Sequence, residues 1–169
     1  MEITKKFFVY GASGHGHVLK EVIESAHLPF GGFIDDDPQS DALSWDQFCT
    51  LYPQASIVLG IGSNTVRSTI AQKIVDKGYD LATVIHPSAI ISPSALLEKG
   101  VVVMPLVVVN AHATIKQGAI LNTSCVIEHD CVIGAFSHIS PRVALAGNVT
   151  VGEFSHIGIC LLYTSPSPR

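Results

Sequence analysis

Aliphatic side chains recur at every sixth position through the second half of the chain, from Ile85 to Ile157. A second row of small or β-branched residues, mostly four positions after the first, keeps the same period. A period of six fits neither the 3.6 of a helix nor the two of an open strand. It is typical of a hexapeptide-repeat parallel β-helix, in which each hexad forms one flat side and three hexads close a coil. The aliphatic row is Ile85, Ile91, Leu97, Val103, Val109, Ile115, Leu121, Ile127, Ile133, Ile139, Leu145, Val151 and Ile157.

In the first part of the chain, residues 1–84, the hydrophobic residues follow a different spacing. A buried strand is predicted at 7–10, followed by a glycine-rich turn at 11–16 and an amphipathic helix at 18–26. Strands alternating with helices through short connections favour a parallel α/β sheet, so we expect a Rossmann-like domain here. The other expected elements are strands at 32–34, 56–61 and 81–85, a loop with a partial helix at 38–53, and a helix at 65–77 capped by Asn64.

Composition excludes several classes of protein. Hydrophobic residues make up 47% of the 169 residues and charged ones 14%, which suggests a membrane protein. The longest apolar run, residues 101–109, is however too short to span a bilayer and contains Pro105. The N-terminus lacks the arrangement of a signal peptide, so we expect a cytoplasmic protein. A net charge of −4 without a basic cluster disfavours nucleic acid. The four cysteines include no CxxC pair; Cys125 and Cys131 fall on the small-residue row and are expected to be reduced core residues, with a disulfide or zinc pair as the alternative.

The last ten residues, 160–169, break the six-residue period. Position 163 is Tyr163 where an aliphatic residue is due, and a Ser-Pro-Ser-Pro run follows. The segment resembles one reading frame of a sequencing-adapter end, so we expect a non-native tail after a β-helix domain that covers 85–159. A genuine disordered tail is the alternative. A β-helix without its final coils exposes an open strand edge, and we expect such a chain to be poorly soluble or inactive.

The turn at 11–16, Gly-Ala-Ser-Gly-His-Gly, is the first candidate site. Its glycines let backbone N–H groups approach a phosphate, and the following helix N-terminus favours an anion. The spacing GxxGxG differs from that of dinucleotide-binding folds, so NAD is disfavoured. Asp35 lies where a carboxylate could accept hydrogen bonds from ribose hydroxyls. Ser13 and His15 add polar groups that packing alone does not need, so nucleotide binding is favoured over a bare tight turn.

A second candidate site is the run Glu-His-Asp at residues 128–130. The six-residue period places His129 and Asp130 at a corner of a coil, where both side chains can project outward. An imidazole beside a carboxylate is suited to act as a general base. His138 lies half a coil further on, on a different side, and stacks below His156. We therefore expect a site between the subunits of a trimer, with a three-histidine metal site as the alternative.

These residues together resemble the bacterial sugar O- and N-acyltransferases, which modify sialic acids and nucleotide-linked amino sugars. The resemblance covers residues 7–159 and is closest to the UDP-4-amino-sugar N-acetyltransferases. The motifs that carry it are YGASGHG (10–16), the pair Asp35 and Asp36, GIGSN (60–64), IHPSA (85–89), LNTSCVIEHDCVIG (121–134) and LAGNVTVG (145–152).

The resemblance implies a left-handed β-helix, a homotrimer, and acetyl-CoA as co-substrate with no metal. His129 would be the general base in a direct transfer, and Asp130 would raise its basicity, although some relatives have Glu at that position. The residues implied to bind the nucleotide-sugar are Ser13, Gly14, His15, Asp35, Asp36, Gly62 and Thr65. Those implied to contact acetyl-CoA are His138, Gly147 and Ile159. A metal-dependent lyase of the carbonic-anhydrase type and a non-catalytic sugar-nucleotide-binding scaffold remain alternatives, and the acceptor atom, nitrogen or oxygen, stays open.

Overall fold

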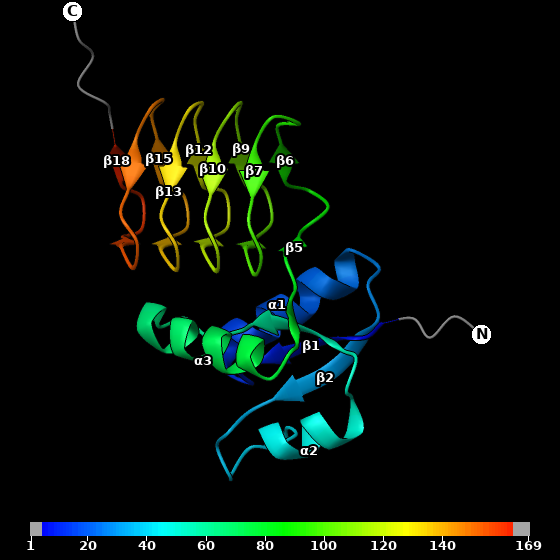
Figure 1. Ribbon diagram of the computed structural model, residues 1–169. Coiled ribbons are helices and arrows are strands. Elements are labelled where there is room, and N and C mark those ends of the chain that lie inside the picture. Colours follow the sequence, from blue (N-terminus) through cyan, green and yellow to red (C-terminus); the bar gives the residue numbers. More distant parts are fainter. Residues whose placement is uncertain (1–4, 164–169) are drawn as a thin grey trace, which may run out of the picture.

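The computed structural model describes residues 5–163, with side chains to Leu162. An α/β unit lies at one end of the picture and a three-sided β-helix at the other (Figure 1). The α/β unit holds a parallel sheet of order β2-β1-β3-β4. Its elements are β1 (Phe7–Tyr10), α1 (Gly14–Ser25), β2 (Phe30–Ile34), α2 (Trp45–Leu51), β3 (Ser56–Leu59), α3 (Asn64–Asp76) and β4 (Asp80–Leu81). The predicted Rossmann-like alternation of strands and helices is confirmed.

Two details of the predicted α/β unit are wrong. The strand expected at 81–85 is two strands, because its hydrogen-bond partner changes: Ala82 N donates to Ile57 O of the α/β sheet, whereas Val84 N donates to Val101 O of the β-helix. The N-cap of α3 is Ser63, not Asn64. Asn64 instead directs its side-chain amide to backbone carbonyls of the β-helix.

The β-helix consists of two-residue strands that stack in register into three parallel sheets. Each strand pairs with the strand one coil away, as Ile120 does with His138. The strands of the three sides are β5 (Val84–Ile85), β8 (Val102–Val103), β11 (Ile120–Leu121), β14 (His138–Ile139) and β17 (His156–Ile157) on side one; β6 (Ile90–Ile91), β9 (Val108–Val109), β12 (Val126–Ile127), β15 (Ala144–Leu145) and β18 (Leu162–Tyr163) on side two; and β7 (Leu96–Leu97), β10 (Thr114–Ile115), β13 (Val132–Ile133) and β16 (Thr150–Val151) on side three.

The six-residue period corresponds to the interior of this prism. The aliphatic row from Val103 to Val151 is buried, and the small-residue row fills the space beside it. The small row lacks an apolar member at position 137, where Ser137 is fully buried. Its hydroxyl donates to Gly134 O at 2.6 Å, which satisfies this buried polar group. The predicted left-handed parallel β-helix is confirmed.

From residue 100 to residue 160, each corner of the β-helix uses one residue in the left-handed backbone region, at every sixth position. From residue 118 onward, the N–H of each such residue donates to a carbonyl of the preceding coil, as Asp130 N does to Ala111 O at 3.0 Å. The conformation costs a non-glycine residue roughly 1–2 kcal/mol, and this inter-coil bond offsets it. The residues are Gly100, Leu106, His112, Gly118, Ser124, Asp130, Phe136, Arg142, Asn148, Phe154 and Cys160, with φ between 53° and 71°.

The repeat continues beyond the boundary expected at Ile159. Strand β18 pairs with β15, and Tyr163 is in register with Leu145, so backbone pairing overrides the loss of the aliphatic side chain. The remaining part of the expected tail, 164–169, lies outside the described residues, as do residues 1–4.

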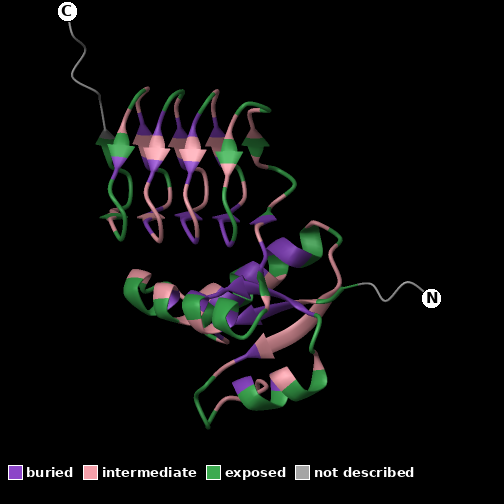
Figure 2. Cartoon of the chain, in the orientation of Figure 1, coloured by how far each residue is buried: buried purple, intermediate pink, exposed green. Residues whose placement is uncertain are grey.

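Side one of the β-helix packs against the α/β unit. Outward-facing Val84 and Val102 are buried in one apolar cluster with Leu19 and Ile23 of α1. Figure 2 shows the same purple, buried colour on the helix and on the strands that face it. The two units therefore share an apolar core.

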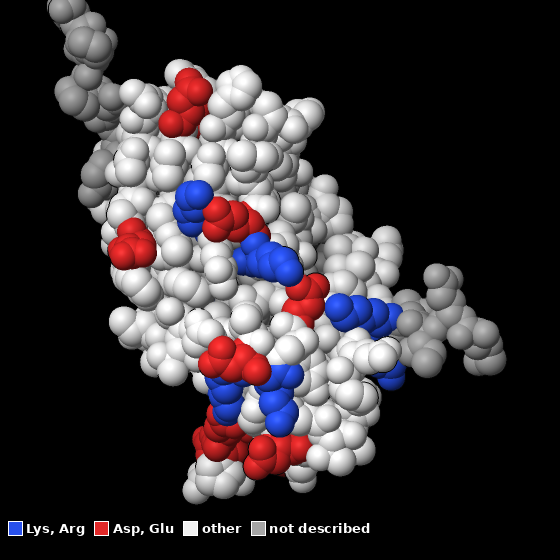
Figure 3. All heavy atoms as spheres, in the orientation of Figure 1, with Lys and Arg blue, Asp and Glu red and all other residues white. Residues whose placement is uncertain are grey.

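The surface carries charges of both signs close together. Lys116 pairs with Glu98 at 2.9 Å, and Asp80 lies between Lys99 and Lys5. Figure 3 shows basic and acidic side chains alternating in a band across this face, with no extended patch of one sign. Among residues 5–163, no helix has both the length and the apolar character needed to cross a bilayer.

Candidate active site

The turn between β1 and α1 presents backbone groups at a helix N-terminus. Ser13 is the N-cap of α1, but its hydroxyl makes no capping bond, and the first turn contains no acidic residue. A Cβ added at Gly14 would meet no atom within 4 Å, whereas a Cβ at Gly16 would collide with Gly11 O. Gly16 is therefore required by packing, and Gly14 leaves space open in front of the helix. Such an N-terminus is suited to an anion.

Asp35 joins the loops that follow β1 and β2. Its Oδ2 accepts from Ala12 N at 2.8 Å, and its Oδ1 accepts from Asp37 N at 3.0 Å. The carboxylate expected to meet a ribose therefore already holds the glycine-rich turn in place. A carboxylate oxygen has a second lone pair, so this role leaves capacity for one further donor.

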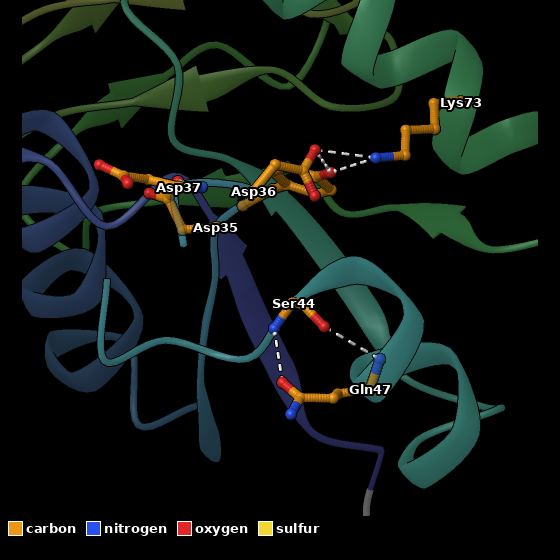
Figure 4. A network of polar contacts seen from close by, with 7 residues as sticks. Asp35, Asp36, Asp37, Ser44, Gln47 and Lys73 are labelled. Atoms are coloured by element: carbon orange, nitrogen blue, oxygen red, sulfur yellow. Dashed lines mark hydrogen bonds and ion pairs between the residues drawn. The ribbon is translucent and has the colours of Figure 1, made fainter. Parts of the chain in front are cut away.

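Asp36, the neighbouring carboxylate, forms a polar triad with Tyr10 and Lys73 (Figure 4). Tyr10 Oη donates to Asp36 Oδ2 at 2.7 Å, and Lys73 Nζ contacts both Asp36 Oδ2 and Tyr10 Oη at 2.8 Å. Burial opposes ionisation of Asp36, but the hydrogen bonds from Lys73 and Tyr10 prevail and lower its pKa. Burial, and then the hydrogen bond to Asp36, raise the pKa of Tyr10. In the structure Asp36 thus points at α3.

The loop after β3 brings a second helix N-terminus to the same edge of the sheet. Gly62 is exposed, and a Cβ there would meet no atom within 4 Å. Thr65, in the first turn of α3, is exposed and lies with its Oγ1 3.4 Å from Ser63 Oγ. Because β1 and β3 are adjacent parallel strands, the loops after them meet at the sheet's carboxyl edge, where α/β folds bind ligands. The predicted nucleotide-sugar residues are thus brought to one edge.

His129 and Asp130 form an exposed pair at the corner between sides two and three of the β-helix. His129 Nδ1 lies 2.8 Å from Asp130 Oδ2. A carboxylate can only accept, so Nδ1 carries the hydrogen, and in the neutral form of the ring Nε2 then holds a free lone pair. Gly147, one coil away, lies against the ring: a Cβ at that position would lie 2.5 Å from His129 Nε2. Gly147 is therefore needed for this ring position.

His138 lies elsewhere, on side one, between the β-helix and the α/β unit. Its ring stacks on His156 with centroids 4.7 Å apart, and its Nε2 is 3.0 Å from Asn122 Nδ2. The His15 ring faces it from α1 at 6.4 Å, and no hydrogen-bond partner among residues 5–163 reaches buried His15 Nε2. Burial, followed by the charge of Arg67, lowers the pKa of His15 to about 4. Burial and then His156 lower that of His138 to about 4.

The expected acetyl-CoA residues do not converge within one chain. His138 is on side one, Gly147 is at the corner between sides two and three, and Ile159 is 68% exposed at the corner between sides one and two. The corner that carries His129 is the one opposite side one, which packs on the α/β unit. One chain therefore holds the two candidate sites on opposite sides of its prism.

Arg67 is a residue that the motif search missed. It is fully buried in α3 and donates to carbonyls of both units. A signal was present in the sequence, since Arg67 shares the apolar face of its helix with Ala71 and Ile74. A single arginine on that face indicates a buried polar contact.

A metal site was the alternative to acetyl transfer. Within the described part of the chain, no three or more His, Cys, Asp or Glu side chains gather in a group that could hold a metal ion. The buried thiols are also protonated at neutral pH, because burial raises the pKa of Cys125 to about 12.

Three comparisons place the chain among known proteins. The model of the PglD N-terminal domain matches residues 6–74. UDP-N-acetylbacillosamine N-acetyltransferase of Bacillus subtilis (strain 168) is 33% identical over 107 residues, and the match covers 57% of this chain and 50% of that enzyme. The chain thus spans about half the length of this curated relative.

Solved structures match over nearly the whole chain. The acetyltransferase domain of PglB from Neisseria gonorrhoeae FA1090, in complex with acetyl coenzyme A, has a TM-score of 0.85 and 34% identity, with 94% of this chain and 82% of that one covered. A mutant of perosamine N-acetyltransferase from Caulobacter crescentus, in complex with CoA and GDP-perosamine, has a TM-score of 0.85 and 31% identity, with 93% of this chain and 81% of that one covered.

Because 93–94% of this chain is covered, these matches include both the α/β unit and the β-helix. The chain belongs to the bacterial sugar acetyltransferase family that includes the PglB domain and perosamine N-acetyltransferase.

Proposed function

We propose that the protein transfers an acetyl group from acetyl-CoA to an amine or hydroxyl of a nucleotide-linked amino sugar or sialic acid, with His129 as the general base. The observation that carries this proposal is the pair of His129 Nδ1 and Asp130 Oδ2, 2.8 Å apart on an exposed corner. The relatives support the donor and acceptor: one binds acetyl coenzyme A, and another binds CoA and GDP-perosamine.

In the proposed reaction the sugar nucleophile attacks the thioester carbonyl directly. His129 Nε2 takes the proton as the new bond to the acetyl carbon forms, and Asp130 stabilises the resulting imidazolium. The carbon–sulfur bond breaks, and the proton passes from His129 to the departing CoA thiolate. No covalent enzyme intermediate is needed, because the enzyme holds both substrates in reactive positions, and this positioning supplies the rest of the rate enhancement.

The nucleotide-sugar is proposed to bind at the carboxyl edge of the α/β sheet. Both α1 and α3 begin there without a side-chain cap or an acidic first turn, and their free N–H groups suit a diphosphate. Gly14 and Gly62 leave the approach open, and Ser13, His15, Asp35, Asp36 and Thr65 lie around the same edge.

We also propose a homotrimer in which one chain's bound sugar meets another chain's His129. Because the two candidate sites lie on opposite sides of one prism, a neighbour is required to bring them together. Side two supports this: its outward residues are all apolar, and Ile90 and Leu162 are 67% and 77% exposed.

A substitution on side two tests the trimer. Val126 lies in β12, the middle strand of that side. Val126→Asp should lower the mass measured by sedimentation equilibrium, whereas the same change at Thr150 on side three should not; an unchanged mass in Val126→Asp contradicts this interface.

Release of CoA thiol from acetyl-CoA, measured with UDP- and GDP-linked amino sugars and with sialic acid, tests the function. Sugar-dependent thiol release and an acetylated product by mass spectrometry are expected, and metal chelation should leave the rate unchanged. Activity that depends on added zinc and hydrates carbon dioxide would favour the metal-dependent lyase instead. Nucleotide-sugar binding without turnover would favour the non-catalytic scaffold.

A further inference from the structure

Arg67 makes a fully satisfied set of hydrogen bonds although, within the part of the chain that the structure describes, it forms no ion pair with a carboxylate. Its Nε donates to Gly118 O at 2.8 Å, and its Nη1 donates to Ile61 O at 3.0 Å and Gly62 O at 3.1 Å. Its Nη2 donates to Phe136 O at 2.7 Å and to Asn64 Oδ1 at 2.9 Å. Each of the five N–H bonds of the guanidinium therefore has an acceptor. Burial lowers the pKa of Arg67 to about 10, so it stays charged at neutral pH.

Asn64 extends the same contact by one coil. Its Nδ2 donates to Phe154 O at 2.9 Å and to Ser155 O at 3.1 Å. The acceptors at 118, 136 and 154 are one coil apart and occupy the same corner, between sides three and one. Arg67 and Asn64 together thus hold three successive coils of the β-helix at one corner.

The other end of this contact is the loop that carries Gly62. Lysine could not replace Arg67 there, because a single ammonium cannot reach acceptors on the loop and on two coils at once. Gly118, whose carbonyl accepts from Arg67, has φ +64°, and a Cβ there would collide with the ring of Phe136, so a glycine is needed for this ring position. Burying a charge whose partners are carbonyl oxygens costs free energy. This cost indicates that the contact fixes the orientation of the two units and does not only fill space between them.

We propose that Arg67 and Asn64 are positioning residues that lock the Gly62 loop, and with it the α/β unit, at a fixed orientation on the β-helix. The inference rests on the proposed function in one respect: a sugar held at this loop must reach a catalytic corner on a neighbouring prism, so a small rotation of the α/β unit moves the acceptor away from the acetyl group. Loss of the lock should therefore reduce turnover more than it reduces coenzyme binding.

The distance between the two units tests the lock without reference to activity. Spin labels at Thr50→Cys on α2 and Thr150→Cys on β16, in a Cys49→Ser, Cys160→Ser background, report this distance; the remaining cysteines, Cys125 and Cys131, are buried. Labelled chains are diluted with unlabelled ones, so that distances within one chain dominate. The distribution should be narrow with Arg67 and broad in Arg67→Met and Arg67→Lys, and Asn64→Ala should broaden it less.

Ile74→Ala is the matched control, because Ile74 is buried on the same face of α3, in an apolar cluster whose buried members all belong to the α/β unit. It should lower the melting temperature and leave the distance distribution narrow. An equally narrow distribution in Arg67→Met, or equal broadening in Ile74→Ala, overturns the proposal. If Arg67→Met does not fold, Arg67→Lys and Asn64→Ala give the same test.

Kinetic measurements distinguish the positioning role of Arg67 and Asn64 from the proposed acetyltransferase function. Arg67→Lys should lower kcat by up to roughly 10²-fold, the effect of an approximately 1 Å misplacement, with the Kd for coenzyme A unchanged. Ile74→Ala should keep its kcat at a temperature where it is folded, and a matching loss there overturns the positioning role. A broadened distance in a protein without sugar-dependent turnover would reject the proposed function and retain the lock.

Discussion

The imidazole rings of His15 and His138 face each other across the contact between the α/β unit and the β-helix, with centroids 6.4 Å apart. Burial is the main reason that both pKa values fall to about 4, and the charge of Arg67 in the same region lowers both further. Both rings are therefore neutral at physiological pH, and the folded state favours the neutral form of each ring over the protonated form.

Stability should consequently fall as the pH is lowered from about 6.5 to about 4. The unfolded chain takes up protons on these histidines near their ordinary pKa of about 6.5, whereas the folded chain resists until about 4, so protons favour unfolding within that window. The melting temperature measured by calorimetry should decline there, and less so in the His15→Asn, His138→Asn double variant. An identical decline in both proteins would assign the pH dependence to other groups.

Removal of His129 should reduce acetyl transfer without unfolding the protein. His129→Ala should lower kcat by roughly 10²–10⁴-fold, the usual effect of losing a general base. The matched control is His112→Ala, since His112 is exposed at the same corner one coil earlier and should be dispensable. Near wild-type turnover in His129→Ala would show that another group is the base.

A methyl group at position 147 should displace the His129 ring. The added Cβ of Gly147→Ala would lie 2.5 Å from His129 Nε2, so the ring has to turn away from Asp130. We expect roughly a 10–10²-fold loss of kcat, since misplaced catalytic groups lose rate steeply. Gly152→Ala is the control, because its Cβ would make only an ordinary contact at 3.6 Å with Ser155 Oγ. Equal activity of both variants would contradict this role of Gly147.

Loss of the Asp35 carboxylate should loosen the glycine-rich turn. Asp35→Ala removes the acceptor of Ala12 N and Asp37 N, and charged hydrogen bonds of this kind contribute about 1.5–3 kcal/mol. Urea unfolding should show a loss of that order, together with weaker binding of UDP. Asp37→Ala removes one exposed bond to Gln39 N and should cost under about 1 kcal/mol. A loss no larger in Asp35→Ala than in Asp37→Ala would remove Asp35 from this role.

The β-helix could be predicted from the sequence because each of its sides has the same local requirement. An aliphatic side chain at every sixth position must point into the prism, and that requirement is visible in the sequence from Ile85 onward. The left-handed corner residues were not visible, because most of them, such as Phe136 and Asp130, are not glycine. Their conformation is imposed by hydrogen bonds to the preceding coil.

The site could be predicted only in part. The period alone separated His129 from His138 on different sides of the coil, and the glycine-rich turn indicated a helix N-terminus. The sequence could not show that Asp35 holds the turn, that Asp36 pairs with Lys73, or that Asn64 reaches the β-helix. Each of these depends on contacts between segments far apart in the chain.

By itself, the sequence determined the period, the inward rows and the order of strands and helices, since these follow from local spacing and side-chain polarity. Only the tertiary structure decided which side of the prism the α/β unit covers. That choice buried His138 beside His15, left His129 on the opposite corner, and enclosed Arg67 between the units. It depends on how two apolar faces and five N–H bonds fit together in space, and no local pattern encodes that fit.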